Sequence, residues 1–151
     1  MDTAVKPQGC TNIKLRQLMR RVAQHYDAEV GKTGLMGTQY SLLSYVVKLG
    51  PIRPGDLARE MKIGPSTLTR NLRPLIDAGW LHLGPGADAR SRLVSVTEAG
   101  REKRQEAQRR WRVAQEGINQ ALGPQRVVAL HALMDECLDL LSPLPDGEAD
   151  E

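Results

Sequence analysis

Residues 66–78 read STLTRNLRPLIDA, and their pattern decides the fold. At 100° per residue, four apolar side chains fall in one sector, as in a helix that packs on a core: Leu68, Leu72, Leu75 and Ile76. The other faces carry short hydroxyls and arginines, namely Ser66, Thr67, Thr69, Arg70 and Arg73. Hydroxyls bond phosphates and base edges, and one arginine can hold guanine O6 and N7 together. Because an ordinary solvated helix surface has the same composition, the neighbouring segments must decide between the two interpretations.

Three helices are predicted before this stretch. Apolar residues at helical spacing predict the first over 11–30, and Gly31 ends it. The second runs over 38–49, with Thr38 as its N-cap and Gly50 as its stop. Pro54 suits the first position of a short third helix that ends near Met61. A tight turn over 62–65, in which we expect Gly64 to take positive φ, then leads into the helix of 66–78.

Two short strands are predicted after it, over 80–83 and 93–96, with a turn-rich loop between them. Pro74 should bend the preceding helix, because proline cannot donate to the Arg70 carbonyl. The loop carries Arg90 and Arg92, and a basic hairpin tip can enter a minor groove, where the potential is most negative. For Asp88 we expect an internal ion pair that shapes the loop. A helix-turn-helix followed by such a hairpin is a winged helix-turn-helix.

Two more helices are predicted at the C-terminal side. Thr97 can cap a long one that ends at Gly123-Pro124, and residues 101–112 hold six bases against two acids. This stretch is either a solvated helix surface or a flank for the DNA backbone. The last helix, over 125–141, is too apolar to lie on a small monomer, so with the first helix it predicts a dimer interface.

The predicted fold class is therefore mainly α with a small β wing, a winged helix-turn-helix with N- and C-terminal dimerisation helices. The expected divisions of the 151 residues are a flexible N-terminus (1–9), a first dimerisation helix and linker (10–37), the DNA-binding domain (38–97), two dimerisation helices (98–141) and an acidic disordered tail (142–151). No apolar run approaches the ~20 residues of a membrane span, and no secretory signal is visible, so we expect a cytoplasmic protein.

Charge and motif content exclude several functions. The net charge is +3 although the last ten residues contain four acids and no base, a balance compatible with a polyanionic partner. His25, His82 and His131 are scattered, and no HExxH, GxSxG or phosphate loop occurs, so an enzyme is not expected. Cys10 and Cys137 have no CxxC spacing, so neither a metal site nor a cofactor is expected.

The order of these elements resembles the MarR family over nearly the whole chain. The resemblance is closest at five short motifs: Leu57-Ala58, Thr67-Leu68-Thr69-Arg70, Gly79, the Asp-x-Arg-x-Arg run of 88–92, and Thr97-Glu98-x-Gly100. It implies a homodimeric transcription factor, often a repressor, that binds a pseudo-palindromic DNA operator with half-sites one helical turn apart. The implied DNA contacts are Ser66, Thr67, Thr69, Arg70 and Arg73 from the helix and Arg90 and Arg92 from the wing.

The resemblance also implies an effector site where the dimerisation helices meet the DNA-binding domain. Effectors in the family are commonly small aromatic or phenolic acids, whose carboxylate a cation near apolar walls could hold. The matching positions are Arg16, Arg20, His25, Tyr26, Gln39, Tyr40 and Leu43. The competing interpretation is that Tyr26 and Tyr40 are simply core residues.

Two other functions remain open. Some relatives sense peroxides through a cysteine near the start of the first helix, and Cys10 lies in that neighbourhood; an inert cysteine is the alternative. Cys137 is expected to be packed in the last helix. A winged helix used only for protein contacts is the other alternative, and it would bind DNA without a steep salt dependence.

Overall fold

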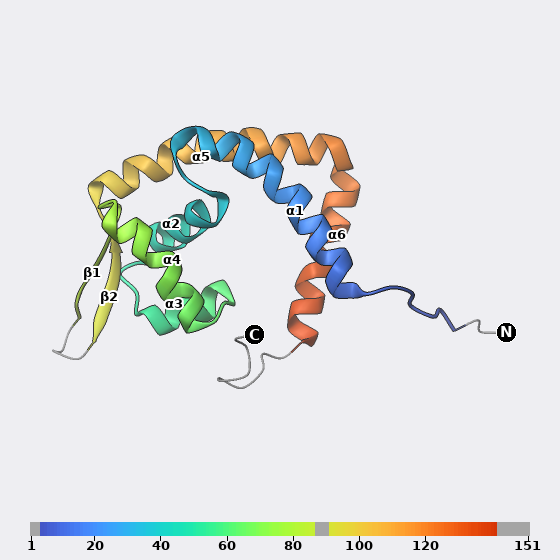
Figure 1. The fold of residues 1–151 in the computed structure, drawn as a ribbon, viewed down its shortest axis with the longest axis horizontal. Coiled ribbons are helices and arrows are strands. Elements are labelled where there is room, and N and C mark those ends of the chain that lie inside the picture. The colour runs from blue at the N-terminus through green and yellow to red at the C-terminus, as the bar shows by residue number, and fades with distance from the viewer. Residues whose placement is uncertain (1–3, 87–90, 142–151) are drawn as a thin grey trace.

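The computed structural model describes residues 4–86 and 91–141 of the chain. It is mainly helical with one two-stranded antiparallel hairpin (Figure 1), which confirms the predicted fold class. The elements follow in the order α1 (Thr11–Val30), a 3-10 turn η1 (Gly31–Thr33), α2 (Gly37–Leu49), α3 (Pro54–Met61), α4 (Pro65–Asp77), β1 (Leu81–Pro85), β2 (Arg92–Val96), α5 (Glu98–Leu122) and α6 (Pro124–Leu140).

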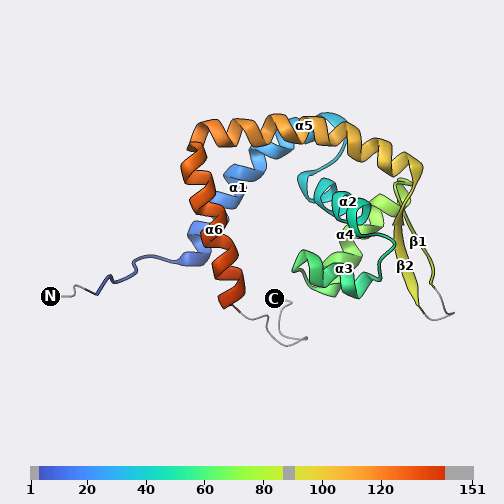
Figure 2. The same cartoon turned by 180° about the vertical axis from the view of Figure 1, so that it is seen from behind.

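The molecule has two parts joined by the long helix α5. The lobe consists of α2, α3, α4 and the β1–β2 hairpin, and it lies beneath one end of α5 (Figure 1). The arm consists of α6, which extends from the other end of α5, and α1, which runs obliquely to α5 and packs against it before the chain enters the lobe, as the reverse view also shows (Figure 2). The tail over 142–151, predicted to be disordered, lies outside the described residues.

The core belongs mainly to the lobe. Leucines and valines from α2, α3, α4 and the hairpin form one buried cluster that reaches Ala107 on α5. Its largest fully buried side chains within the lobe are Leu42, Leu43, Val46, Leu57, Leu68, Leu75, Leu81 and Val94. The apolar stripe of α4 predicted from the sequence thus faces this core, with Leu68, Leu72 and Leu75 buried and Ile76 partly buried.

The junction between α1 and α2 is capped differently from the prediction. Thr38 lies inside α2, which begins at Gly37, so its assignment as N-cap was wrong. The Gly37 amide instead donates to Asp27 Oδ1 at 2.8 Å, and the Met36 amide donates to Gln39 Oε1 at 2.9 Å. Free amides at a helix start need acceptors, and here one comes from α1. The cap therefore also ties α2 to the arm.

The turn between α3 and α4 depends on Lys62 rather than Gly64. Lys62 has φ 56° and ends α3, whereas Gly64 has φ −71°, so the predicted positive φ at Gly64 was wrong. The turn is closed by the Ile63 amide, which donates to the Ala58 carbonyl at 3.0 Å. After it, α4 starts at Pro65 and continues as one helix through Pro74.

The wing follows α4 through Gly79, which has φ 80°, a value that favours glycine. The Trp80 amide donates to the Leu75 carbonyl at 3.0 Å and closes the helix end. The hairpin pairs Leu81 with Val96 and Pro85 with Arg92, so its strands are longer toward the tip than predicted. Ile52 also pairs with Val94, which connects the hairpin to the segment between α2 and α3.

The start of α5 is tied to the wing by Thr97 and Gly100. The Thr97 hydroxyl accepts from the Gly100 amide at 3.0 Å, as the predicted cap requires, and donates to the Gly79 carbonyl at 2.6 Å. Gly100 allows close approach, because a Cβ there would lie 2.0 Å from the Trp80 carbonyl oxygen. The lobe is therefore held to α5 at the base of the wing.

Candidate nucleic-acid interface

The exposed side of α4 carries the residues predicted to read DNA. Ser66, Thr69, Arg70 and Arg73 are exposed, and Thr67 is partly buried. Since Leu68, Leu72 and Leu75 hold the opposite side in the core, the helix can present only this side to a partner. The structure thus places all five predicted helix residues on one element, on or beside its solvent face.

The two arginines of α4 differ in their partners. Arg73 Nε lies 3.6 Å from Asp77 Oδ1, one turn further along the helix, and both side chains are largely exposed. Arg70 forms no hydrogen bond or ion pair with any residue in the described part of the chain. The Thr69 hydroxyl donates to the Pro65 carbonyl at 3.0 Å. Arg70 is therefore the α4 base that is ready to bind an external acceptor.

Only part of the predicted wing site can be located. Arg92 is exposed on β2, opposite Pro85, and the Gly86 amide donates to the Ser91 carbonyl at 2.8 Å near the tip. Asp88 and Arg90 lie outside the described residues. Their assigned roles, an internal ion pair and a minor-groove contact, stay predictions.

One exposed base beside α4 was missed in the sequence analysis. Lys62 lies in the turn just before α4, and its side chain is exposed. A lysine in the turn of a helix-turn-helix is a candidate for phosphate contact. Lys62 is visible in the sequence of the turn, but the prediction for this turn concerned Gly64 alone.

Several basic side chains of α5 contact other residues of the chain. Bases that flank a DNA backbone would instead be directed toward solvent. Lys103 Nζ lies 5.4 Å from the centroid of the Trp80 ring and 3.5 Å from Glu106 Oε2. Arg104 Nε donates to Ser44 Oγ at 3.4 Å. These contacts hold α5 on the lobe, which favours the interpretation of this stretch as an ordinary helix surface with structural side chains.

Two of the predicted effector residues meet where α1, α2 and α5 come together. Tyr26 of α1 and Tyr40 of α2 both stack on Trp111 of α5, with ring centroids 6.5 Å and 6.2 Å apart. The Tyr26 hydroxyl donates to Gln115 Oε1, and burial raises the pKa of this phenol. In this protomer Tyr26 and Tyr40 are packing residues, as the competing interpretation expected. Trp111, which brings them together, was not among the predicted site residues.

The other predicted effector residues are spread over the arm and the lobe. Arg16 and Arg20 lie on the exposed N-terminal half of α1, and Arg16 Nε donates to Asn12 Oδ1 at 3.1 Å. His25 lines an open hollow of about 430 Å³ between α1 and α5. Gln39 caps α2, and Leu43 is fully buried. One protomer therefore brings the aromatic members together but not the cations that would hold a carboxylate.

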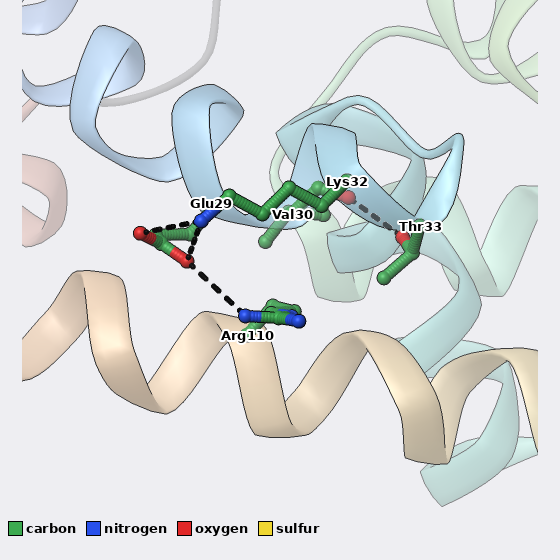
Figure 3. A network of polar contacts seen from close by, with 5 residues as sticks. All are labelled: Glu29, Val30, Lys32, Thr33 and Arg110. Atoms are coloured by element: carbon green, nitrogen blue, oxygen red, sulfur yellow. Dashed lines mark hydrogen bonds and ion pairs between the residues drawn. The ribbon is translucent and has the colours of Figure 1, made fainter.

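A small polar network joins the end of α1 to α5 near these aromatic rings (Figure 3). Glu29 Oε2 lies 3.2 Å from Lys32 Nζ and 3.9 Å from Arg110 Nη1. The buried Thr33 hydroxyl donates to the Val30 carbonyl at 2.6 Å. The network fixes the chain where it leaves the arm and enters the lobe.

Both cysteines are free and exposed in the protomer. Cys10 is the N-cap residue of α1, and its carbonyl accepts from the Lys14 amide at 3.1 Å. Cys137 lies on the exposed surface of α6, the helix assigned to the dimer interface, so its packing there stays a prediction. A sensing role for Cys10 stays a hypothesis.

The described ranges hold neither a metal-binding cluster nor a helix that could span a membrane. In residues 4–86 and 91–141, no group of three or more His, Cys, Asp and Glu side chains is arranged to hold a metal ion. Within those ranges, none of the helices has the length and apolarity that a bilayer crossing requires.

Comparison with known proteins agrees with this geometry. Residues 33–91 match the model of the MarR family. The chain is 26% identical over 93 residues to YwoH of Bacillus subtilis, an uncharacterised helix-turn-helix transcriptional regulator, over 62% of this chain and 68% of YwoH.

Solved structures extend the similarity to the arm. The chain resembles the MosR regulator of M. tuberculosis in complex with DNA, with a TM-score of 0.71, 27% identity and coverage of 86% of this chain and 99% of MosR. It shares its fold with BpsR of Bordetella bronchiseptica, whose DNA binding is regulated by 6-hydroxynicotinic acid, with a TM-score of 0.78, 20% identity and coverage of 89% and 99%. The chain therefore belongs to the MarR family and is a DNA-binding helix-turn-helix transcriptional regulator rather than an enzyme.

Proposed function

We propose that the protein is a homodimeric repressor of bacterial genes, acting in the cytoplasm on a pseudo-palindromic operator. Each α4 enters a major groove and each wing an adjacent minor groove, with half-sites about 34–36 Å apart, one helical turn of DNA. The observation that carries this proposal is the exposed face of α4. It presents hydroxyls and Arg70, which pairs with no residue of the described ranges, on a helix whose other side is held in the core.

The homodimer is supported by the arm. Within one protomer many large apolar side chains of α1 and α6 face solvent, which a soluble monomer rarely allows over a contiguous surface. These are Ile13, Leu15, Leu18 and Met19 on α1 and Val128, Leu133, Met134, Leu138 and Leu140 on α6. A second copy of the chain would cover them, and a twofold axis would set the two α4 helices as a pair.

For the effector we propose a small aromatic or phenolic acid. BpsR, which has the same fold, responds to such a molecule. In this chain, α1, α2 and α5 meet at the stacked rings of Tyr26, Tyr40 and Trp111, so a flat ligand wedged there would change how the lobe sits on the arm. Release from DNA requires that the ligand bind the non-binding arrangement more tightly than the DNA-binding one.

The test is fluorescence anisotropy with the DNA upstream of the protein's own gene and with a scrambled duplex, over a series of salt concentrations. We expect a preference of at least ~10³-fold for one sequence and a steep loss of affinity with salt. Equally weak binding to both duplexes with a shallow salt slope would favour a winged helix that contacts proteins instead. A transcription assay with the bound operator then tells repression from activation.

A further inference from the structure

The exposed face of α4 contains an acid, Asp77, that the proposed DNA contacts do not include. At 100° per residue, four residues fall within one sector of about 60°, opposite the buried leucines: Ser66, Arg70, Arg73 and Asp77. Asp77 is the only acid of α4, and its direction lies between those of Arg70 and Arg73. Phosphates repel a carboxylate on a surface that approaches DNA, so the presence of Asp77 in this sector requires another explanation.

Helix stability does not supply that explanation. Asp77 is the last residue of α4, where the negative end of the helix dipole disfavours an acid. Its ion pair with Arg73 has the base before the acid, which is the less favourable order for residues four apart. The two side chains, Arg73 and Asp77, are 79% and 65% exposed, and exposed pairs contribute little to folding. Asp77 is therefore poorly placed to stabilise α4.

The geometry of the pair suits a different role, which is to orient Arg73. Asp77 Oδ1 lies 3.6 Å from Arg73 Nε, and Arg73 has no other partner in residues 4–86 and 91–141. A guanidinium carries several N–H donors in one rigid plane, so a carboxylate near Nε leaves other donors for a second acceptor. Helical side chains lean toward the N-terminus, which is the end of a recognition helix that reaches base edges. Asp77 thus lies behind Arg73 with respect to the DNA.

We propose that Asp77 is a positioning residue that holds the guanidinium of Arg73 toward one guanine in each operator half-site, where O6 and N7 accept. This inference rests on the proposed function, in which α4 enters the major groove. The pair attracts more strongly there than on a free surface, because a closed interface excludes water. The charge of Asp77 by itself repels phosphates of any sequence. Only its action on Arg73 changes the preference for one sequence over another.

The test is fluorescence anisotropy with the DNA upstream of the protein's own gene and with a scrambled duplex. It compares wild type, Asp77→Asn, Arg73→Ala and the double variant. Asp77→Asn should lower the ratio of the two affinities about threefold to tenfold, because Arg73 loses its fixed orientation. In the Arg73→Ala background, Asp77→Asn should leave the ratio unchanged, although the lost charge should tighten binding to both duplexes.

Selection of binding sites from a pool of random duplexes identifies the base concerned. Wild type should select a guanine at one fixed position of each half-site, and both Asp77→Asn and Arg73→Ala should lose the preference at that position. Arg70→Ala should relax a different position. Arg73→Lys keeps the charge but not the planar fork, so it should lose the guanine preference while the salt dependence stays the same.

A matched control separates positioning from the loss of one negative charge. Asp56→Asn makes the same chemical change in an acid that pairs with an arginine of its own helix, Arg59 on α3. It should leave the affinity ratio and the selected sequence unchanged. Circular dichroism should show native helix content for every variant, since the side chains of Asp56, Arg70, Arg73 and Asp77 all reach solvent.

The negative outcomes separate this inference from the proposed function. A wild-type chain with equal affinity for both duplexes would overturn the operator function and this inference with it. A wild type that prefers its operator, with the same ratio for Asp77→Asn as for Asp56→Asn, would overturn only the positioning role. A fall in the ratio that persists in the Arg73→Ala background would also overturn it, because Asp77 would then contact DNA by itself.

Discussion

In the lobe, most large apolar side chains of α2, α3 and α4 are buried, whereas in the arm those of α1 and α6 largely face solvent. Leu75 in the lobe is 0% exposed and Leu138 in the arm is 50% exposed, although both belong to amphipathic helices. The lobe has its own core, and the arm lacks a partner for its apolar surface. The difference indicates that the lobe is stabilised by a buried core, to which Val30 of α1 and Ala107 of α5 contribute, whereas the apolar surface of the arm is the part that the proposed second copy would cover.

The largest expected effect is a loss of folding stability that occurs in the lobe but not in the arm. Leu75→Ala should lower the free energy of unfolding by about 2–5 kcal/mol, because it leaves a cavity in the lobe core. Leu138→Ala, a truncation of the same size in the arm, should instead weaken the dimer and leave the protomer folded. Urea denaturation at several protein concentrations measures both. Equal losses for the two variants at low concentration would remove the distinction between lobe and arm.

The next effect concerns the joint between the lobe and α5. Gly100→Ala should destabilise the protein by about 1–3 kcal/mol, because the new Cβ would overlap the Trp80 carbonyl oxygen. Gly117→Ala is the matched control, since a Cβ there meets no atom within 4 Å. Thermal unfolding of both variants makes the comparison. If Gly100→Ala is as stable as Gly117→Ala, the close contact at the wing base does not matter.

A third effect lies on the exposed face of the lobe. Arg70→Ala should weaken operator binding by about 1–3 kcal/mol and relax the sequence preference, because Arg70 is free to contact a base. Arg73→Ala should cost less, since Arg73 already has Asp77 as a neighbour. Anisotropy titrations with operator and scrambled DNA measure both properties. Unchanged affinity in both variants would argue strongly against docking through α4.

The smallest effect tests where the arm meets the lobe. Tyr26→Phe removes the hydrogen bond to Gln115 and should cost about 1 kcal/mol. Burial raises the pKa of Tyr26 in the folded protein, so its contribution to stability is complete below pH 10 and is lost as the pH rises through the folded-state value. Wild-type stability should therefore fall more than that of the variant above pH 10. Tyr45→Phe is the control, and parallel pH profiles for Tyr26→Phe and wild type would contradict the assignment.

Local signals predicted most of the fold. Gly50, Pro54, Thr97 and Gly123-Pro124 mark the helix ends where the structure has them, because caps and prolines act on their own turn of chain. The exposed face of α4 was likewise read correctly from helical spacing. Two local predictions, at Thr38 and Gly64, were wrong because another residue has the expected role. Asp27 accepts from the first amide of α2, and Lys62 takes the positive φ of the turn before α4.

The sequence by itself determined the order of the elements, the buried and exposed faces of α4, and the family. The faces and ends of each helix depend on residues within a few turns of one another, and the family on short motifs of this kind that follow in a set order. The tertiary structure alone decided that Asp27 of α1 caps α2 and that Trp111 joins Tyr26 and Tyr40. It also decided that, among the described residues, Arg73 has an ion-pair neighbour and Arg70 has none. Contacts of the first two kinds join residues on different helices, and the third depends on side-chain geometry, so spacing along the chain carries no record of them.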